Sequence, residues 1–269
     1  MGKNKEHNLY QRFKGHREGY CSICNELKIL TEDHIPPKAC GNTNVKIGDF
    51  LHNMKEIYSS KGLVLKTICK ECNGMIGEYD EKLAVLYKYI NSYINSTLTT
   101  YGNIEFKGNI EDIKKSIVGH ILAGFDTPNK ADDQQLKSKG IHRITFREYM
   151  LNNKPLPNYI KIHYWYHLND KIIFNPGFGY TPNYRIKNGQ IVCSLMKIRP
   201  LAFMIADYSD TNIKLTLPEL KSKNEDTFFI RYDSQYFLHP DYPFNVNKNG
   251  IIMFSSENNY YAEKINNNL

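Results

Sequence analysis

The sequence has 269 residues, of which 41% are hydrophobic and 23% are charged, a composition typical of a soluble globular protein with one or two domains. It contains no run of about 18 apolar residues, which excludes a transmembrane helix, and no apolar stretch follows the charged N-terminus as it would in a secretory signal. We therefore expect a cytoplasmic protein with no membrane partner. The formal net charge of +7 is compatible with a polyanionic partner such as nucleic acid.

We expect three regions along the chain. Residues 1–20 form a basic N-terminal arm, which fits phosphate binding and fits a solvated, frayed terminus equally well. Residues 21–98 hold four cysteines in two pairs, followed by a helical stretch. Residues 99–269 resemble a separate α+β unit in which no catalytic motif is recognisable.

Three helices are predicted from apolar periodicity and capping residues. The first covers residues 73–95, where apolar side chains recur at three- and four-residue spacing. The second covers about residues 110–125, with Asn109 as its N-cap and acidic residues in its first turn. The third is short and begins at Thr145, which starts a capping-box pattern.

After residue 155 the pattern changes to strands. Residues rich in β-branched and aromatic side chains predict strands at 159–168, 171–175, 184–187, 190–196 and 227–232. Asn188-Gly189 and Asn249-Gly250 are typical of two-residue hairpin turns, and Asn169-Asp170 is a less specific third case. The aromatic run between His163 and His167 is more typical of core packing than of a nucleic-acid platform. The predicted fold class is α+β, and its C-terminal part is a mostly antiparallel sheet.

Two Cys-x-x-Cys pairs predict a structural zinc site. The pairs are Cys21 with Cys24 and Cys69 with Cys72. Each pair can direct two thiolates at one ion from a tight turn, and two such turns complete a closed tetrahedral Cys₄ site. Such a site contributes folding free energy directly. Cys40 and Cys193 lie outside this pattern and are expected to be small buried hydrophobic residues.

The residues around these pairs resemble a known family. Glu32-Asp33-His34-Ile35-Pro36-Pro37 lies between the pairs, and Asn73 directly follows the second pair. The set Cys-x-x-Cys, Asp-His-Ile-x-Pro and Cys-x-x-Cys-Asn is similar to the HNH (ββα-metal) endonucleases, especially the zinc-containing branch related to phage recombination endonuclease VII. The resemblance covers about residues 21–81. It implies that residues 21–98 form a zinc-bound ββα-metal nuclease domain that hydrolyses DNA.

The resemblance also implies roles for individual residues. His34 is expected to be the general base, because a near-neutral pKa suits proton abstraction at pH 7. Asp33 and Asn73 are expected to hold one catalytic divalent cation, and their oxygen ligands suit Mg²⁺ or Mn²⁺. Asn73 is expected to open the helix of the ββα unit. Since neighbouring strand residues point to opposite faces, we expect a distortion near Pro36 and Pro37 to let Asp33 and His34 share one site.

The sequence departs from the family on the helix. Many members carry a further histidine a turn or two after the asparagine, where this chain has Gly77, Glu78, Asp80 and Glu81. Asp80 falls on nearly the same helix face as Asn73 and is a candidate third ligand of the catalytic cation. Acidic residues near a helix start are also favoured by the helix dipole, so both interpretations of Asp80 stay open.

The leading hypothesis is a metal-dependent DNA endonuclease. The alternative is a zinc-containing nucleic-acid-binding protein without catalytic activity, and a third hypothesis is a protein–protein adaptor built on the C-terminal sheet. Small HNH proteins with a second domain resemble bacterial anti-phage effectors and mobile-element nucleases, in which that domain binds a partner protein or a regulatory signal. Relatives of endonuclease VII dimerise, so a homodimer is also compatible with the resemblance.

Overall fold

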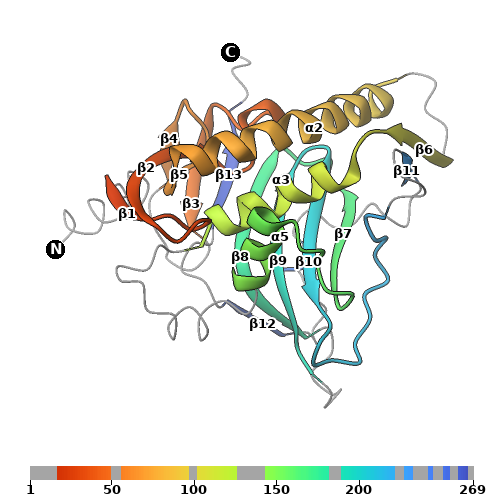
Figure 1. The fold of residues 1–269 in the computed structure, drawn as a ribbon. Coiled ribbons are helices and arrows are strands. Elements are labelled where there is room, and N and C mark those ends of the chain that lie inside the picture. Colours follow the sequence, from red (N-terminus) through yellow and green to blue (C-terminus); the bar gives the residue numbers. More distant parts are fainter. Residues whose placement is uncertain are drawn as a thin grey trace.

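The computed structural model describes residues 17–49, 56–96, 102–125, 143–181, 189–221, 227–232, 242–244, 251–254 and 260–265 (Figure 1). Residues 1–16 of the predicted arm, the predicted strand at 184–187 and the predicted turn at Asn249-Gly250 lie outside these residues. None of the helices in the described residues has the length and apolar character needed to cross a membrane.

A small sheet and one long helix form the N-terminal part of the fold. β2 (Leu27–His34) is the central strand between β1 (Glu18–Tyr20) and β5 (Val64–Cys69), and both of its pairings are antiparallel. α2 (Lys70–Ile94) follows β5 without a loop and contacts both β2 and β5. Two antiparallel strands are therefore followed directly by a helix that packs against them.

The segment between β2 and β5 connects this part to the rest of the molecule. It contains the short 3-10 helix η1 (Lys38–Cys40) and the strands β3 (Val45–Asp49) and β4 (Ile57–Ser59). β3 pairs with β13 (Tyr260–Lys264), which in turn pairs with β8 (Lys171–Thr181). Strands from both sides of the predicted boundary at residue 98 thus share one sheet.

This large sheet has the order β4-β3-β13-β8-β9-β10-β7, and β12 (Ile251–Phe254) pairs with β8 beside that path. The remaining strands are β7 (Ile160–Tyr166), β9 (Ile191–Ile198) and β10 (Leu201–Asp207). A separate pair is formed by β6 (Gly102–Lys107) and β11 (Thr227–Tyr232). All strand pairings within the described residues are antiparallel. The mixed fold with mostly antiparallel sheets agrees with the predicted class.

The central strands of the large sheet are buried on both faces. In β10, Leu201 and Phe203 belong to the main core, whereas Ala202 and Met204 belong to a second core on the opposite face. The same alternation places Trp165 in the second core while its neighbours in β7 pack in the main one. The aromatic run of β7 is thus core packing, as predicted, and Cys40 and Cys193 are buried as predicted.

Three helices pack side by side and cover one face of the large sheet (Figure 1). α3 (Ile110–Ala123) lies between α2 and α5 (Arg143–Asn152) and contacts both. The close approach of α3 to α2 depends on Gly119, where an added Cβ would lie 2.9 Å from Cγ1 of Ile76. This packing brings α3 against the end of the small sheet, where the candidate site lies.

Several predicted boundaries differ from the structure. α2 begins at Lys70, three residues before the predicted start, because Cys69 occupies its N-cap position. Asn73 therefore lies in the first turn of α2 and does not open the helix. Asn169-Asp170 does not close a hairpin, because β7 pairs with β10 and β8 pairs with β9.

Candidate functional site

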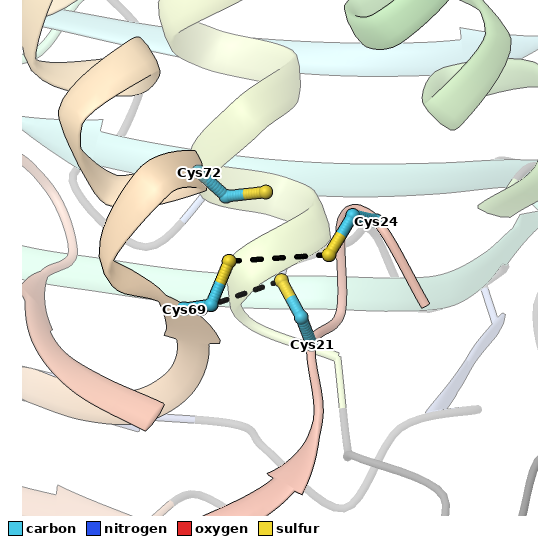
Figure 2. Close-up of side chains that lie close together, drawn as sticks. All are labelled: Cys21, Cys24, Cys69 and Cys72. Carbon is cyan, nitrogen blue, oxygen red and sulfur yellow. Dashed lines mark hydrogen bonds between the residues drawn. The ribbon is translucent and has the colours of Figure 1, made fainter. Parts of the chain in front are cut away.

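Four cysteine sulfurs converge where the small sheet meets the start of α2 (Figure 2). Cys21 and Cys24 lie in the connection between β1 and β2, Cys69 ends β5, and Cys72 lies in the first turn of α2. The four Sγ atoms lie within 4.8 Å of one another, and those of Cys24 and Cys69 are 3.9 Å apart. A tetrahedral site with Zn–S bonds of about 2.3 Å separates its sulfurs by about 3.8 Å. The four cysteines are therefore positioned to bind one metal ion, and the geometry is compatible with structural zinc.

One thiol of this cluster is set apart electrostatically. A hydrogen bond from Cys72 lowers the pKa of Cys21 to about 5, and the backbone N–H of Cys69 donates to Cys21 Sγ at 3.4 Å. The same contact with Cys21 raises the pKa of Cys72. Both contacts favour the thiolate form of Cys21, and a thiolate is the form of cysteine that binds metal ions.

The cluster is attached to helices that lie beyond the region of the family resemblance. Ser22 accepts a hydrogen bond on its carbonyl from Nε of Arg147 in α5, at 3.0 Å, and its own N–H donates to the carbonyl of Thr67 at 2.9 Å. The hydroxyl of Thr67 donates to the carbonyl of Ala123 at the end of α3. The turn that carries the first cysteine pair is therefore held in place by α3, α5 and β5 together.

Asn73 connects the first turn of α2 to β2. Its Nδ2 donates to Oγ1 of Thr31 at 3.0 Å and to the carbonyl of Glu32 at 2.9 Å. Thr31 in turn donates to the carbonyl of Ile68 in β5 at 3.1 Å. The asparagine thus fixes the helix start against the strand that carries Asp33 and His34, and it leaves its Oδ1 for a ligand.

Asp33 and Asp80 both contact His120, a histidine that was not among the predicted site residues. His120 in α3 is fully buried, and its two ring nitrogens face two carboxylates. Nε2 lies 2.8 Å from Oδ1 of Asp80, and Nδ1 lies 3.3 Å from Oδ2 of Asp33, which is itself only 4% exposed. Ser116, one turn before His120, donates to the same oxygen of Asp80 at 2.6 Å. Asp33, Asp80 and His120 thus come from β2, α2 and α3, respectively.

The electrostatic balance around His120 favours its protonated form. Burial alone lowers the pKa of an imidazole, but the negative charges of Asp80 and Asp33 outweigh burial and raise the pKa of His120 to about 10. The two carboxylates thus stabilise a positive charge at the position of this ring.

His34 stands at the end of β2, next to Asp33 but in a different environment. The register of β2 with β5 shifts between Thr31 and Glu32, but beyond this shift Asp33 and His34 pair in sequence with Leu65 and Val64, so the two side chains leave the strand in opposite directions. Burial lowers the pKa of the half-buried His34, and the charge of Lys38 lowers it further. His34 is thus neutral at pH 7, with a lone pair available to accept a proton.

The loop after His34 is fixed by one buried amide. Nδ2 of Asn42 donates to the carbonyl of Pro36 at 2.7 Å and to the carbonyl of Leu63 at 2.9 Å, while its Oδ1 accepts from the N–H of Leu63 at 2.7 Å. Asn42 is completely buried, so each of these bonds replaces one that water would otherwise provide. The amide holds the end of β2 against the start of β5.

The structure brings the predicted residues into two neighbouring groups. The four cysteines form one cluster, and Asn73 bonds to the backbone beside Asp33, while the carboxylates of Asp33 and Asp80 converge on His120. His120 was not predicted as a site residue because no metal-binding spacing includes it. One signal was present, since His120 interrupts an otherwise apolar stretch of the predicted helix at 110–125.

A comparison of the chain with protein-family models, with curated proteins and with solved structures found no match. The sequence resemblance implies a catalytic divalent cation, and the atoms around His120 show whether such an ion would fit there. Among the described residues, Oδ2 of Asp33 and Nδ1 of His120 are buried side-chain atoms that have no hydrogen-bond partner. A carboxylate oxygen and an imidazole nitrogen are both metal-ligating atoms, so this donor set fits a divalent cation.

Proposed function

We propose that the chain is a metal-dependent endonuclease of the HNH type that hydrolyses phosphodiester bonds in DNA. The observation that carries this proposal is the arrangement of β2, β5 and α2, two antiparallel strands followed directly by a helix, with the four-cysteine cluster at the point where β5 becomes α2. His34 lies at the end of β2 and Asn73 in the first turn of α2, and the motif resemblance proposes these two residues as a general base and a ligand. The net charge of +7 adds support for a polyanionic substrate.

His34 would act as the general base. Its lowered pKa keeps the ring neutral at pH 7, so it can take a proton from an attacking water molecule. Asn42 and Asn73 hold the strand end on either side of it, which fixes the direction from which the base approaches a phosphate. When bound, a divalent cation such as Mg²⁺ or Mn²⁺ would polarise the phosphate and stabilise the departing 3′ oxygen.

The four cysteines would hold a structural Zn²⁺. Cys69 and Cys72 lie on either side of the junction between β5 and α2, so an ion bound there fixes the helix start. Asn73 is the next residue, and its bonds to β2 transmit that position to Asp33 and His34. The zinc would therefore orient the catalytic residues without touching the substrate.

Plasmid nicking in the presence of Mg²⁺ or Mn²⁺ tests the proposal. We expect the wild-type protein to convert supercoiled plasmid to nicked or linear forms, and His34→Ala to lower that rate by about 10²–10⁴-fold, the usual contribution of a general base. Leu27→Ala serves as the control, because Leu27 lies on the same strand but is 58% exposed. Both variants should keep the wild-type zinc content and melting temperature. Cleavage by His34→Ala at the wild-type rate contradicts the assignment of the base.

One observation favours the second candidate function, a zinc-containing nucleic-acid-binding protein without catalysis. The carboxylates of Asp33 and Asp80 both lie against His120, a residue outside the motif resemblance, and an imidazolium there satisfies both charges without a metal. The same assay separates the two functions. Binding of DNA that weakens steeply with salt, together with no nicking under either cation, supports the binding protein.

A role in anti-phage defence or in a mobile element, with the C-terminal half binding a partner protein or signal, extends the proposal by analogy with small HNH proteins.

A further inference from the structure

The contact between Asp33 and His120 is chemically unusual for a buried pair. Nε2 of His120 lies 2.8 Å from Oδ1 of Asp80. Because a carboxylate oxygen accepts, this hydrogen bond places a proton on Nε2. Nδ1 then faces Oδ2 of Asp33 at 3.3 Å, yet neither of these two buried atoms has a hydrogen-bond partner among the described residues. When the ring is protonated, Nδ1–H faces this carboxylate oxygen without making a hydrogen bond to it, so a bound cation could take the place of the Nδ1 proton and satisfy both atoms.

The distance between the two atoms suits a shared cation. Ligands at right angles around an ion with bonds of about 2.1 Å lie about 3.0 Å apart. The 3.3 Å between Nδ1 of His120 and Oδ2 of Asp33 is within a few tenths of an ångström of that separation. A small inward movement of either side chain would place both atoms on one ion.

The position of Asp80 supports the same assignment. Metal-binding histidines commonly donate their other ring N–H to a carboxylate, which fixes the ring orientation and makes the ligating nitrogen more basic. Asp80 occupies this place on Nε2, and Ser116 holds its Oδ1 with a hydrogen bond of 2.6 Å. The arrangement Asp80–His120–ion thus needs no further group to orient it.

We propose that Nδ1 of His120 and Oδ2 of Asp33 are two ligands of the catalytic cation, and that Asp80 orients His120 without touching the ion. The inference rests on the proposed function for the existence of that cation. α2 lacks the further histidine that many members of the resembled family carry on this helix, and in this proposal α3 supplies the imidazole in its place. The role of Asp80 changes from a candidate direct ligand to a positioning residue. Asn73 bonds to the carbonyl of the residue before Asp33, so its Oδ1 is the nearest further oxygen that the chain offers.

A nitrogen ligand also changes the expected metal preference. Imidazole suits transition-metal ions, whereas Mg²⁺ prefers a shell of oxygen atoms. Mn²⁺ accepts both, so the site should bind Mn²⁺ more tightly than Mg²⁺. Mn²⁺ is also paramagnetic, which allows its ligands to be identified without any measurement of cleavage.

The test is pulsed electron paramagnetic resonance of Mn²⁺ bound to the full-length, zinc-loaded protein. We expect modulation from a directly bound ¹⁴N nucleus, and we expect labelling of histidine with ¹⁵N to replace it with the ¹⁵N pattern. The signal should persist in His34→Ala and disappear in His120→Asn. Asp80→Asn should keep the signal but weaken Mn²⁺ binding by about 10–100-fold, the usual effect of losing an outer carboxylate.

Three results would overturn the inference. Mn²⁺ bound without nitrogen modulation excludes His120 as a ligand, and loss of the modulation in His34→Ala assigns the nitrogen to His34. No binding of Mn²⁺ by wild-type protein with intact zinc makes the Asp33–His120–Asp80 contact a structural ion pair. The first and third results come from wild-type protein alone, so they hold even if His120→Asn fails to fold.

Nicking of plasmid by the same preparations separates this inference from the proposed function. Nitrogen modulation without nicking under Mn²⁺ or Mg²⁺ retains the metal site and rejects the endonuclease. Nicking by protein whose Mn²⁺ shows no bound nitrogen retains the endonuclease and rejects His120 as a ligand.

Discussion

Replacing Cys69 by serine should remove the metal from the four-cysteine cluster and destabilise the fold. A structural zinc contributes about 10–16 kcal/mol of apparent binding free energy at pH 7, or about 2.5–4 kcal/mol for each of the four thiolates if they share it evenly. A domain has a total unfolding free energy of only about 5–15 kcal/mol, so the loss of one ligand is a large part of it. In a chain of this size 1 kcal/mol shifts the melting temperature by about 2–4 °C, which predicts a decrease of about 10 °C.

Cys40→Ser is the matched control, because it makes the same atomic change at a cysteine outside the cluster. Cys40 is 6% exposed, so a buried hydroxyl there costs about 1–3 kcal/mol but leaves the metal ligands intact. Zinc content measured by mass spectrometry and unfolding followed by calorimetry should separate the two variants. If Cys69→Ser keeps one zinc per chain and melts no lower than Cys40→Ser, the four cysteines do not share an ion.

Four further predictions concern the support of the site and the wider fold. Asn42→Ala should lower the unfolding free energy by about 3 kcal/mol in urea titrations, because three buried backbone groups lose their hydrogen-bond partner. A loss below about 1 kcal/mol would mean that water replaces the side-chain amide. Asn109→Ala should cost about 1 kcal/mol, because its Oδ1 accepts from two N–H groups at the start of α3, and Asn109→Ser should restore most of it. Burial lowers the pKa of His163, so the folded protein keeps it neutral while the unfolded chain takes up a proton near pH 6.5. The unfolding free energy should therefore fall as the pH drops below about 6.5, and His163→Gln should flatten that fall in urea titrations between pH 5 and 7. A fragment of residues 1–98 should give no cooperative thermal transition by circular dichroism, because it lacks α3 and the strands that pair with β3; a sharp transition would show that this part folds alone.

Local patterns in the sequence predicted the elements that depend on local chemistry. The cap of α3 is a clear case, since Asn109 accepts hydrogen bonds from Glu111 and Asp112 as its side chain and position indicated. The four-cysteine cluster is another, because the spacing of the two Cys-x-x-Cys pairs predicted one shared site and their four Sγ atoms lie within 4.8 Å of one another. Both features are decided by residues that are close in sequence or by one specific chemical requirement.

Features that depend on distant partners were missed or displaced. β10 was not predicted as a strand because it is buried on both faces, and its continuous apolar run lacks the alternation that marks a half-buried strand. β8 was expected to stop at Asn175, but it continues through Pro176 with an irregular register, stabilised by Ser194, which donates to the Pro176 carbonyl at 2.7 Å. His120 meets Asp33 and Asp80 only because α3 packs on α2, which no local spacing records.

The position of α3 is the reason why we expect the two halves of the chain to depend on each other. At its C-terminal end, the carbonyl of Ala123 accepts a hydrogen bond from the hydroxyl of Thr67 beside the four-cysteine cluster. Its buried face places His120 between Asp33 and Asp80. One rigid helix thus contacts the supports of both candidate metal centres, and its own position is set by close packing on α2 at Gly119. A displacement of α3 would change the cluster and the carboxylate pair together. The C-terminal half is in this sense part of the site, because its helix α3 supplies the imidazole that contacts both buried carboxylates.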